Sequence, residues 1–342
     1  MKRVLVVDDS AVIRERFREL LAGSDEFVVD VAADGVFALA HMERRWPDVL
    51  VVDLEMPRMD GFSLLSRVMK ERPTPAVVCS SLTEKGAEAT VRALAAGAVS
   101  VFPKHQLRAK DGSSSAEGDF LRMVREASMS QVAGCAQALP PPSKPAAPGA
   151  ELRPAVIAIG SSTGGPQTVE RLLVGLPETT PGIVITQHMP SPFTSAFAQR
   201  LDTLCALTVK EAQGGELVAP GLVFIAPGGR HLVLRREPRG LVTQVLDAPP
   251  VNRHRPSVDV LFRSVARLGA DVVAMLLTGM GDDGARGLLE LRQAGARTFA
   301  QSEASCVVYG MPKEAVALGA ASQTSLEELR SVLLRCRASP PS

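Results

Sequence analysis

A serine in a glycine-rich turn is the first residue of this chain that could do chemistry. Residues 160–166 read GSSTGGP, between a short apolar run at 155–159 and a helical pattern at 167–176. The segment 160–164 fits the G-x-S-x-G spacing of a sharp strand-to-helix turn that presents its central serine, Ser162, as a nucleophile. Glycine suits such a turn because it tolerates unusual φ values and close backbone approach. Two other interpretations stay open on this motif alone: a phosphate site at a helix N-terminus and a simple helix cap.

Two further strand ends carry the other groups that a hydrolytic triad needs. The expected strand 183–186 leads into QHMP, which contains His188, and the expected strand 272–277 leads into TGMGDDG, which contains Asp283. Parallel strands of an open α/β sheet present their carboxyl ends at one edge. A hydroxyl nucleophile, an imidazole base and a carboxylate that fixes the imidazole tautomer are therefore expected to meet there. The chain order Ser-His-Asp excludes an ordinary α/β-hydrolase, in which the order is Ser-Asp-His.

Three neighbours compete for these roles. His231, in APGGRH, and His254, in VNRHRP, are rivals of His188 as the base. We favour His188 because it directly follows a short, fully apolar strand. Asp282 is the rival of Asp283, and a Gly-Asp-Asp-Gly turn also suits a metal loop or a helix N-cap. No second carboxylate cluster lies nearby in the sequence, so we expect no metal or other cofactor in this half of the chain.

Carboxylates gather at strand ends in the first half of the chain as well. Asp8 and Asp9 follow one expected strand and Asp53 ends another, while Ser80 and Lys104 follow the next two. Three carboxylates at one edge repel each other, and a divalent cation with oxygen ligands, such as Mg²⁺, relieves that repulsion. Asp53 is then able to attack a phosphoryl group whose charge is offset by the metal, Lys104 and a hydroxyl.

Both halves alternate short apolar runs with helical patterns, which predicts βαβ units around parallel sheets. We expect two doubly wound α/β domains, at residues 1–128 and 153–338, the second with a larger, mostly parallel, Rossmann-like sheet. Between them, residues 129–152 contain ALPPPSKPAAPG, which is typical of a semi-rigid linker. The expected strands lie at 4–7, 28–31, 49–52, 76–79 and 99–102, then at 155–159, 183–186, 222–226, 272–277 and 297–300, with a hairpin-like pair at 232–234 and 241–245.

Composition excludes several classes of protein. The length of 342 residues allows two domains with cores of their own, and a formal net charge of +1 argues against nucleic acid as a partner. The N-terminal apolar run is too short for a signal peptide, and no run is long enough to span a membrane. The five cysteines are odd in number and widely spaced, so we expect reduced thiols and a cytoplasmic protein without membrane insertion.

Residues 2–128 resemble the receiver domain of response regulators, with VVDDS, VVDLEMPRMDG, a Ser80 hydroxyl and Lys104 in the order of that family. The resemblance implies a five-stranded, flavodoxin-like parallel sheet and phosphorylation by a histidine kinase of the chemotaxis type. Two positions depart from the family: Pro103 precedes Lys104, where receivers usually have Lys-Pro, and Val101 occupies the usual aromatic switch position. The resemblance implies a Mg²⁺ site formed by Asp8, Asp9, Asp53 and the Glu55 carbonyl, with Asp53 as phosphoacceptor and Ser80 and Lys104 as phosphoryl contacts.

The second domain resembles the catalytic domain of the chemotaxis protein-glutamate methylesterase, or CheB, family. The motifs that carry the resemblance are GSSTGGP, QHMPSPFTSAFAQRL, IAPGGRH, VNRHRPSVDVLF, LTGMGDDGA and QSEASCVVYGMPKEA. It implies that Ser162, His188 and Asp283 form the triad of a monomeric enzyme. The implied reactions are hydrolysis of glutamate methyl esters and deamidation of glutamines on the cytoplasmic helices of chemoreceptors. It also implies that the unphosphorylated receiver covers the active site and that phosphorylation uncovers it.

Further roles follow for residues near the triad. The oxyanion of an acyl-transfer reaction needs backbone N–H donors, and Thr163 and Met280 are the candidates. Arg253 and Arg255 are candidates for positioning the substrate, and surface ion pairs are an equally good interpretation of both.

Two other functions compete with the esterase. A non-catalytic signalling adaptor or phosphate sink would use the same receiver, but a degraded triad would be expected and all three residues are intact. A nucleotide-binding effector would use GSSTGG as a phosphate cradle, but Pro166 and Gln167 stand where a P-loop lysine is needed.

Overall fold

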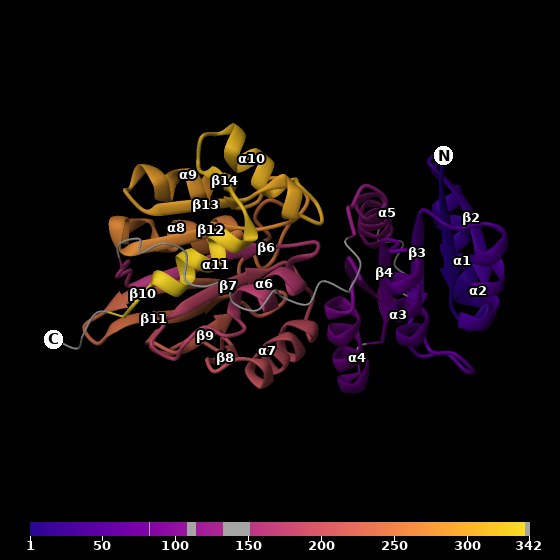
Figure 1. Cartoon of the computed structure of the whole chain (residues 1–342), viewed down its shortest axis with the longest axis horizontal. Helices are drawn as coiled ribbons and strands as arrows, with labels where there is room; N and C mark the ends of the chain where they lie inside the picture. Colours follow the sequence, from indigo (N-terminus) through magenta and orange to yellow (C-terminus); the bar gives the residue numbers. More distant parts are fainter. Residues whose placement is uncertain (82, 108–113, 133–150, 339–342) are drawn as a thin grey trace. The chain divides into compact units, whose positions relative to one another are not determined.

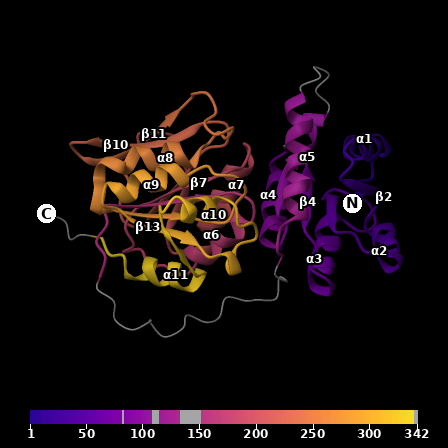
Figure 2. The same cartoon turned by 90° about the horizontal axis from the view of Figure 1, so that it is seen from above.

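The computed structural model describes residues 1–81, 83–107, 114–132 and 151–338, and its contacts divide the chain into units 1–138 and 139–342 (Figures 1 and 2). Each unit is an α/β domain, as the sequence predicts. The linker expected at 129–152 falls largely on residues 133–150, outside the described residues. No helix in the described part of the chain is long and apolar enough to span a membrane.

The N-terminal unit contains a five-stranded sheet in the order β2-β1-β3-β4-β5, in which every pairing is parallel. Helices α1 and α5 contact each other, whereas α2, α3 and α4 pack in succession, so helices cover both faces. The strands are β1 (Lys2–Val7), β2 (Phe27–Ala32), β3 (Val49–Asp53), β4 (Ala76–Ser80) and β5 (Ser100–Pro103). The helices are α1 (Ala11–Ala22), α2 (Gly35–Arg44), α3 (Gly61–Glu71), α4 (Glu84–Ala95) and α5 (Ser114–Ser128), with the 3-10 helix η1 (Lys104–Leu107).

Continuous apolar runs explain the central strands of this unit. The whole of β3 and β4 is buried, as expected for parallel strands covered on both faces. Three phenylalanine rings from α1, β5 and α5 form one cluster, in which Phe102 lies 5.0 Å from Phe120 and 6.4 Å from Phe17 between ring centroids. Phe102 and the neighbouring Val101 are both buried, so the side chain at the expected switch position, Val101, and the aromatic ring next to it both belong to the core.

The C-terminal unit contains a seven-stranded parallel sheet in the order β14-β13-β12-β6-β7-β9-β8 and a separate antiparallel hairpin, β10–β11. The strands are β6 (Val156–Ser161), β7 (Ile183–Gln187), β8 (Thr208–Glu211), β9 (Leu222–Ile225), β10 (His231–Glu237), β11 (Gly240–Leu246), β12 (Val272–Leu276), β13 (Arg297–Gln301) and β14 (Ser322–Thr324). The helices are α6 (Gly165–Leu173), α7 (Phe193–Leu204), α8 (Val258–Val265), α9 (Ala285–Gln293), α10 (Met311–Ala317) and α11 (Leu326–Arg335), with the 3-10 helices η2 (Ala266–Asp271) and η3 (Glu303–Ser305).

The strand order of this sheet positions the candidate triad. β6 lies between β12 and β7, so the three strands that precede Ser162, His188 and Asp283 are neighbours at the centre of the sheet. All three strands are fully buried. Helices α8, α9 and α10 pack in succession on one another, as do α7, α6 and α11. The carboxyl ends of β12, β6 and β7 therefore open at one edge, as the topology rule for α/β sheets requires.

Two strands, β8 and β14, were not expected from the sequence. They occupy the two edges of the seven-stranded sheet, and each contains exposed or half-buried polar residues rather than a continuous apolar run. An edge strand packs on fewer neighbours, so its sequence needs fewer apolar residues. The expected strands are all present close to their predicted limits.

Candidate active site

Ser162 lies immediately after β6, at the turn into α6. Ser161 and Gln187 are partners across β6 and β7, so Ser162 and His188 follow paired positions of adjacent strands. The Ser162 N–H donates to the Thr278 carbonyl at 3.0 Å, and the Gln187 side chain donates to the Ser162 carbonyl at 2.9 Å. The backbone of the serine is therefore held by the last residue of β7 and by the loop that follows β12.

Glycines allow this turn to form without side-chain clashes. Gly164 caps α6 with a φ of 75°, a left-handed conformation that favours glycine. A Cβ atom at Gly279 would lie 2.6 Å from the Ser162 Cβ, closer than real side chains approach each other. The T-G-M-G loop after β12 therefore packs directly on the serine because residue 279 has no side chain.

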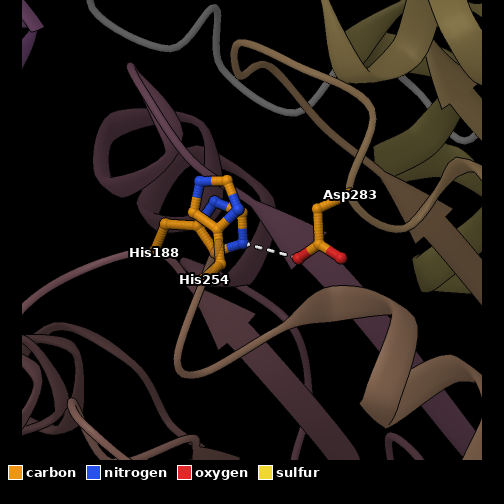
Figure 3. Close-up of side chains that lie close together, drawn as sticks. All are labelled: His188, His254 and Asp283. Atoms are coloured by element: carbon orange, nitrogen blue, oxygen red, sulfur yellow. Dashed lines mark hydrogen bonds and ion pairs between the residues drawn. The ribbon is translucent and has the colours of Figure 1, made fainter. Parts of the chain in front are cut away.

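His188 and Asp283 form a direct hydrogen bond between Nε2 and Oδ2 at 2.8 Å (Figure 3). The carboxylate is an acceptor, so the ring carries its proton on Nε2 and its lone pair on Nδ1. The His188 Nδ1 atom is buried and takes no hydrogen bond within the described residues. The roles of the two ring nitrogens are thus exchanged relative to the usual Ser-His-Asp triad, in which the carboxylate binds Nδ1. Nδ1 is the nitrogen left to accept a proton from Ser162.

The Ser162 hydroxyl makes no hydrogen bond to His188 in this structure. Nucleophile–base contacts are often long without substrate. The structure therefore shows the hydrogen-bonded His188–Asp283 pair directly, with the backbone of Ser162 on the adjacent strand end.

The N-terminus of α8 holds the Asp283 carboxylate. Its Oδ1 accepts hydrogen bonds from Ser257 Oγ at 2.8 Å, Asp259 N at 3.2 Å and Asn252 Nδ2 at 3.2 Å, and its Oδ2 accepts one from Val258 N at 2.7 Å. Burial by itself would raise the pKa of this carboxyl group, but His188 and the other hydrogen-bond donors hold the pKa well below its usual range. The carboxylate is fully buried, and its lowered pKa keeps it ionised at neutral pH.

Asn252, Ser257 and α8 were missed as part of the site. The motif VNRHRPSVDVLF contributes to the family resemblance, but from this motif we predict site roles only for its histidine and its arginines. Its apolar residues at 258, 261, 262 and 265 have helical spacing and follow a serine, which is a recognisable helix start. The carboxylate partner of that helix N-terminus was not predictable, because it comes from a loop about 25 residues further along the chain.

The two rival histidines have different surroundings. His231 is buried, accepts a hydrogen bond from Ser257 N on Nδ1 at 3.1 Å, and donates from Nε2 to the Pro249 carbonyl at 3.0 Å. Both of its nitrogens are therefore used in holding the loop before α8. The ring of His254 instead stacks on that of His188, with centroids 3.8 Å apart and planes within 7° (Figure 3).

Ligand atoms of His188, His254 and Asp283 lie within 4.8 Å of one another, a spacing that suits a metal ion. The orientation of the groups does not suit one. Imidazole binds a metal along a nitrogen lone pair in the ring plane, and two parallel stacked rings cannot both direct such a lone pair at one ion. The Asp283 oxygens already accept five hydrogen bonds.

The other predicted site residues are the two oxyanion candidates and the two arginines. Met280 is half-buried in the loop that contacts Ser162, and its N–H donates no hydrogen bond in the described part of the chain, whereas Thr163 is buried. Arg255 forms an exposed ion pair with Asp247 at 3.0 Å. Arg253 is exposed, with a φ of 65°.

The predicted carboxylate cluster of the N-terminal unit is assembled. Oxygens of Asp8, Asp9 and Asp53 lie within 4.8 Å of one another. Lys104 Nζ lies 2.6 Å from Asp8 Oδ2 and 2.6 Å from Asp53 Oδ2. Burial raises the pKa of Asp53 to about 6, and the Asp8 charge adds to the rise, although Lys104 opposes it. The same ion pairs raise the pKa of Lys104 despite its burial.

This donor set fits a Mg²⁺ ion. Three carboxylates face one lysine, which leaves uncompensated negative charge among hard oxygen ligands. Glu55 is exposed, and its N–H donates to Asp53 Oδ1 at 3.2 Å. Ser80 is buried, and its hydroxyl donates to the carbonyl of Gly86, in the first turn of α4, at 3.1 Å.

Comparison with known proteins identifies the family. Residues 157–333 match the family model for CheB methylesterase, and residues 4–110 match that for the response regulator receiver domain. The chain belongs to the CheB methylesterase family. A protein of Dechloromonas aromatica named protein-glutamate methylesterase/protein-glutamine glutaminase 2 is 50% identical over 94% of both chains. One of Hahella chejuensis with the same name is 47% identical over 98% of this chain and 96% of its own.

A solved structure supports the same assignment. The CheB methylesterase catalytic domain of Thermotoga maritima is 37% identical and covers 54% of this chain and 98% of its own, with a TM-score of 0.51. The present chain is thus an ester hydrolase of the CheB family that also carries a receiver domain.

Proposed function

We propose that this CheB-family enzyme hydrolyses methyl esters of glutamate side chains, and amides of glutamine side chains, on the cytoplasmic helices of chemoreceptors. The observation that carries this proposal is the buried His188–Asp283 pair beside the Ser162 turn. The names of the Dechloromonas and Hahella relatives supply the substrate class.

The geometry supports an acyl-enzyme mechanism. Ser162 Oγ attacks the ester carbonyl while its proton passes to His188 Nδ1. Asp283 keeps the Nε2 proton in place and offsets the positive charge of the imidazolium. The tetrahedral intermediate then collapses, the C–O bond to the methoxy group breaks, and Nδ1 returns the proton to give methanol. Water attacks the acyl-enzyme by the same route, with Nδ1 as base, and releases glutamate and Ser162.

The Met280 N–H is the best candidate for one oxyanion donor. It lies in the loop whose Gly279 packs on Ser162, and it donates no other hydrogen bond within the described residues. Thr163, at the turn into α6, is the second candidate. Loss of one such donor typically reduces kcat by about 10²–10³-fold.

The receiver supplies the regulation in this proposal. The Asp53 carboxylate attacks the phosphorus of a phosphodonor, normally the phosphohistidine of a chemotaxis-type kinase, and the bond from phosphorus to the leaving group breaks. Lys104 is placed to offset charge on the phosphoryl oxygens. A Mg²⁺ ion bound by Asp8, Asp9, Asp53 and the Glu55 carbonyl would offset the rest. Phosphorylation then shifts the equilibrium between inactive and active forms of the full chain.

Methanol release from methylated receptor membranes tests the proposal. We expect the wild type to release methanol, and a small-molecule phosphodonor with Mg²⁺ to accelerate release. Ser162→Ala should abolish release, whereas Asp53→Ala should keep the basal rate and lose the acceleration. No release from cognate receptors by the phosphorylated wild type would reject the esterase function in favour of a signalling adaptor.

A further inference from the structure

A cavity of about 780 Å³ lies in the C-terminal unit, and none of the triad residues lines it. Its lining comes from the β10–β11 hairpin, from α8, which packs on β10, and from η2, which packs on α8. Asp271, on its rim, directly precedes β12. The triad loop follows the other end of that strand, so the cavity belongs to the opposite edge of the sheet.

Four arginines line this cavity: Arg235 and Arg236 from β10, Arg263 from α8, and Arg267 from η2. Arg263 is engaged, with ion pairs to Asp259 at 3.2 Å and to Glu290 at 2.9 Å. The other three are exposed and form no ion pair or hydrogen bond through their side chains within the described residues. Asp271 is the only acidic residue of the lining, so the cavity carries a strong positive charge on a chain whose net charge is +1.

The inner wall of the cavity is apolar. Leu234 and Leu241, from the two strands of the hairpin, are 5% and 8% exposed, and Leu268 is half-buried. The Leu234 N–H donates to Ser264 Oγ at 3.1 Å, which ties the hairpin to α8 and fixes the shape of the wall. The cavity thus combines a rigid apolar wall with a cationic mouth.

We propose that this cavity binds a small organic anion that carries at least two phosphate or carboxylate groups. Guanidinium groups present paired donors that match both kinds of group. A volume of this size is typical of small-molecule sites, in which apolar walls bury the body of the ligand and a few polar groups orient it. The apolar wall would hold the carbon skeleton, and Arg235, Arg236 and Arg267 would bind the charged groups.

Calorimetric titration of the full chain tests this site. Pyrophosphate and citrate serve as probes, in EDTA so that the carboxylates of the receiver cannot bind anions through a metal. The test variants are Arg235→Gln and Arg267→Gln, because both side chains are exposed and make no internal bonds. Arg263 stays unchanged because its partner Asp259 is linked through Asn252 to Asp283. The matched control is Arg239→Gln, an exposed arginine of the same hairpin that pairs with Glu237 outside the cavity lining.

We expect saturable binding of one probe anion per chain and a loss of at least about tenfold in affinity for each test variant, equal to about 1.4 kcal/mol. Tighter binding of pyrophosphate would assign the ligand to phosphate compounds, and tighter binding of citrate to polycarboxylates. Absence of saturable binding, or an equal loss in Arg239→Gln, would overturn the proposal, since only general charge attraction would remain. Esterase activity plays no part in this test, so its outcome is independent of the proposed function.

Discussion

Asp53 and Asp283 both lie at the carboxyl-end edge of a parallel sheet, one in each unit, yet their surroundings are opposite. Asp53 is the last residue of the buried strand β3, whereas Asp283 lies in the loop after the buried strand β12, and both side chains are buried. Asp53 shares one lysine with a second carboxylate, and burial raises its pKa to about 6. Asp283 accepts five hydrogen bonds, and its pKa is held well below the usual range.

The difference shows how one strand-end position can serve two kinds of chemistry. A carboxylate with few donors keeps free lone pairs, and these are what a metal ligand and a nucleophile need. A carboxylate saturated by donors has none to spare, and instead fixes its partner and holds a constant charge. The number of donors supplied by the following loops, more than the strand itself, sets the role of the aspartate.

The catalytic side of this comparison predicts the largest effect. Asp283→Asn should reduce kcat for methanol release by about 10³–10⁴-fold. A neutral amide cannot offset the positive charge that His188 gains when it accepts the serine proton, and it does not fix the Nε2 proton as a carboxylate does. The matched control is Asp282→Asn, since Asp282 is the exposed neighbour and should change kcat by less than about threefold. Far-ultraviolet circular dichroism would show that both variants are folded. The reverse ranking of the two variants would place the triad carboxylate at residue 282.

In the receiver, the corresponding substitution, Asp53→Asn, is expected to increase the free energy of unfolding. Folded Asp53 keeps its proton up to about pH 6, whereas the unfolded chain releases it near 3.8. Stability from this group is therefore present below pH 3.8 and is lost as the pH rises to 6. Without Mg²⁺, Asp53→Asn should raise the free energy of unfolding by about 1–3 kcal/mol at pH 8, and by less at pH 5.

Urea unfolding followed by tryptophan fluorescence measures this effect in the full chain. Trp46, the only tryptophan, lies in the N-terminal unit and donates from Nε1 to Thr74 Oγ1 at 2.7 Å, so it reports on the receiver. The exposed Asp9 provides the control, through Asp9→Asn. A variant at Asp53 that is less stable than the wild type at pH 8 would mean that the lysine pair outweighs burial.

The sequence was sufficient to predict the central strands of both sheets and the residues at their carboxyl ends. It was not sufficient to predict the groups that hold those residues in place. Apolar runs located the central strands. The rule that parallel strands present their carboxyl ends at one edge predicted that His188 and Asp283 lie close together. The donors from Asn252 and from the start of α8 come from a segment whose contacts depend on tertiary packing. Asp283 bonds Nε2 of His188 instead of Nδ1 because of the orientation of the ring, and the spacing of residues in the sequence does not determine that orientation. The edge strands β8 and β14 were not predicted because they lack apolar runs.

The stacked histidine extends the support of the catalytic pair beyond hydrogen bonds. His254→Ala should lower kcat by about 2–12-fold, because an aromatic pair contributes about 0.5–1.5 kcal/mol to holding the His188 ring. His254→Phe keeps a ring in that place and should recover most of the rate. A change confined to kcat, with KM preserved, indicates positioning of the base. If the phenylalanine variant were as slow as the alanine variant, a nitrogen of His254 would be required instead of its ring.

The cations of the two regions differ in the opposite sense to the carboxylates, and the smallest expected effect concerns them. Lys104 is held between two buried carboxylates, whereas Arg253 is exposed beside the stacked histidine, with no ion pair among the residues that the structure describes. If Arg253 attracts an acidic substrate, Arg253→Gln should raise KM by about 2–5-fold and leave kcat unchanged, as expected for an exposed charge. Arg255→Gln is the matched control, because Arg255 already pairs with Asp247. Initial rates measured across a range of methylated receptor concentrations would separate the two, and equal KM values would show that neither arginine positions the substrate.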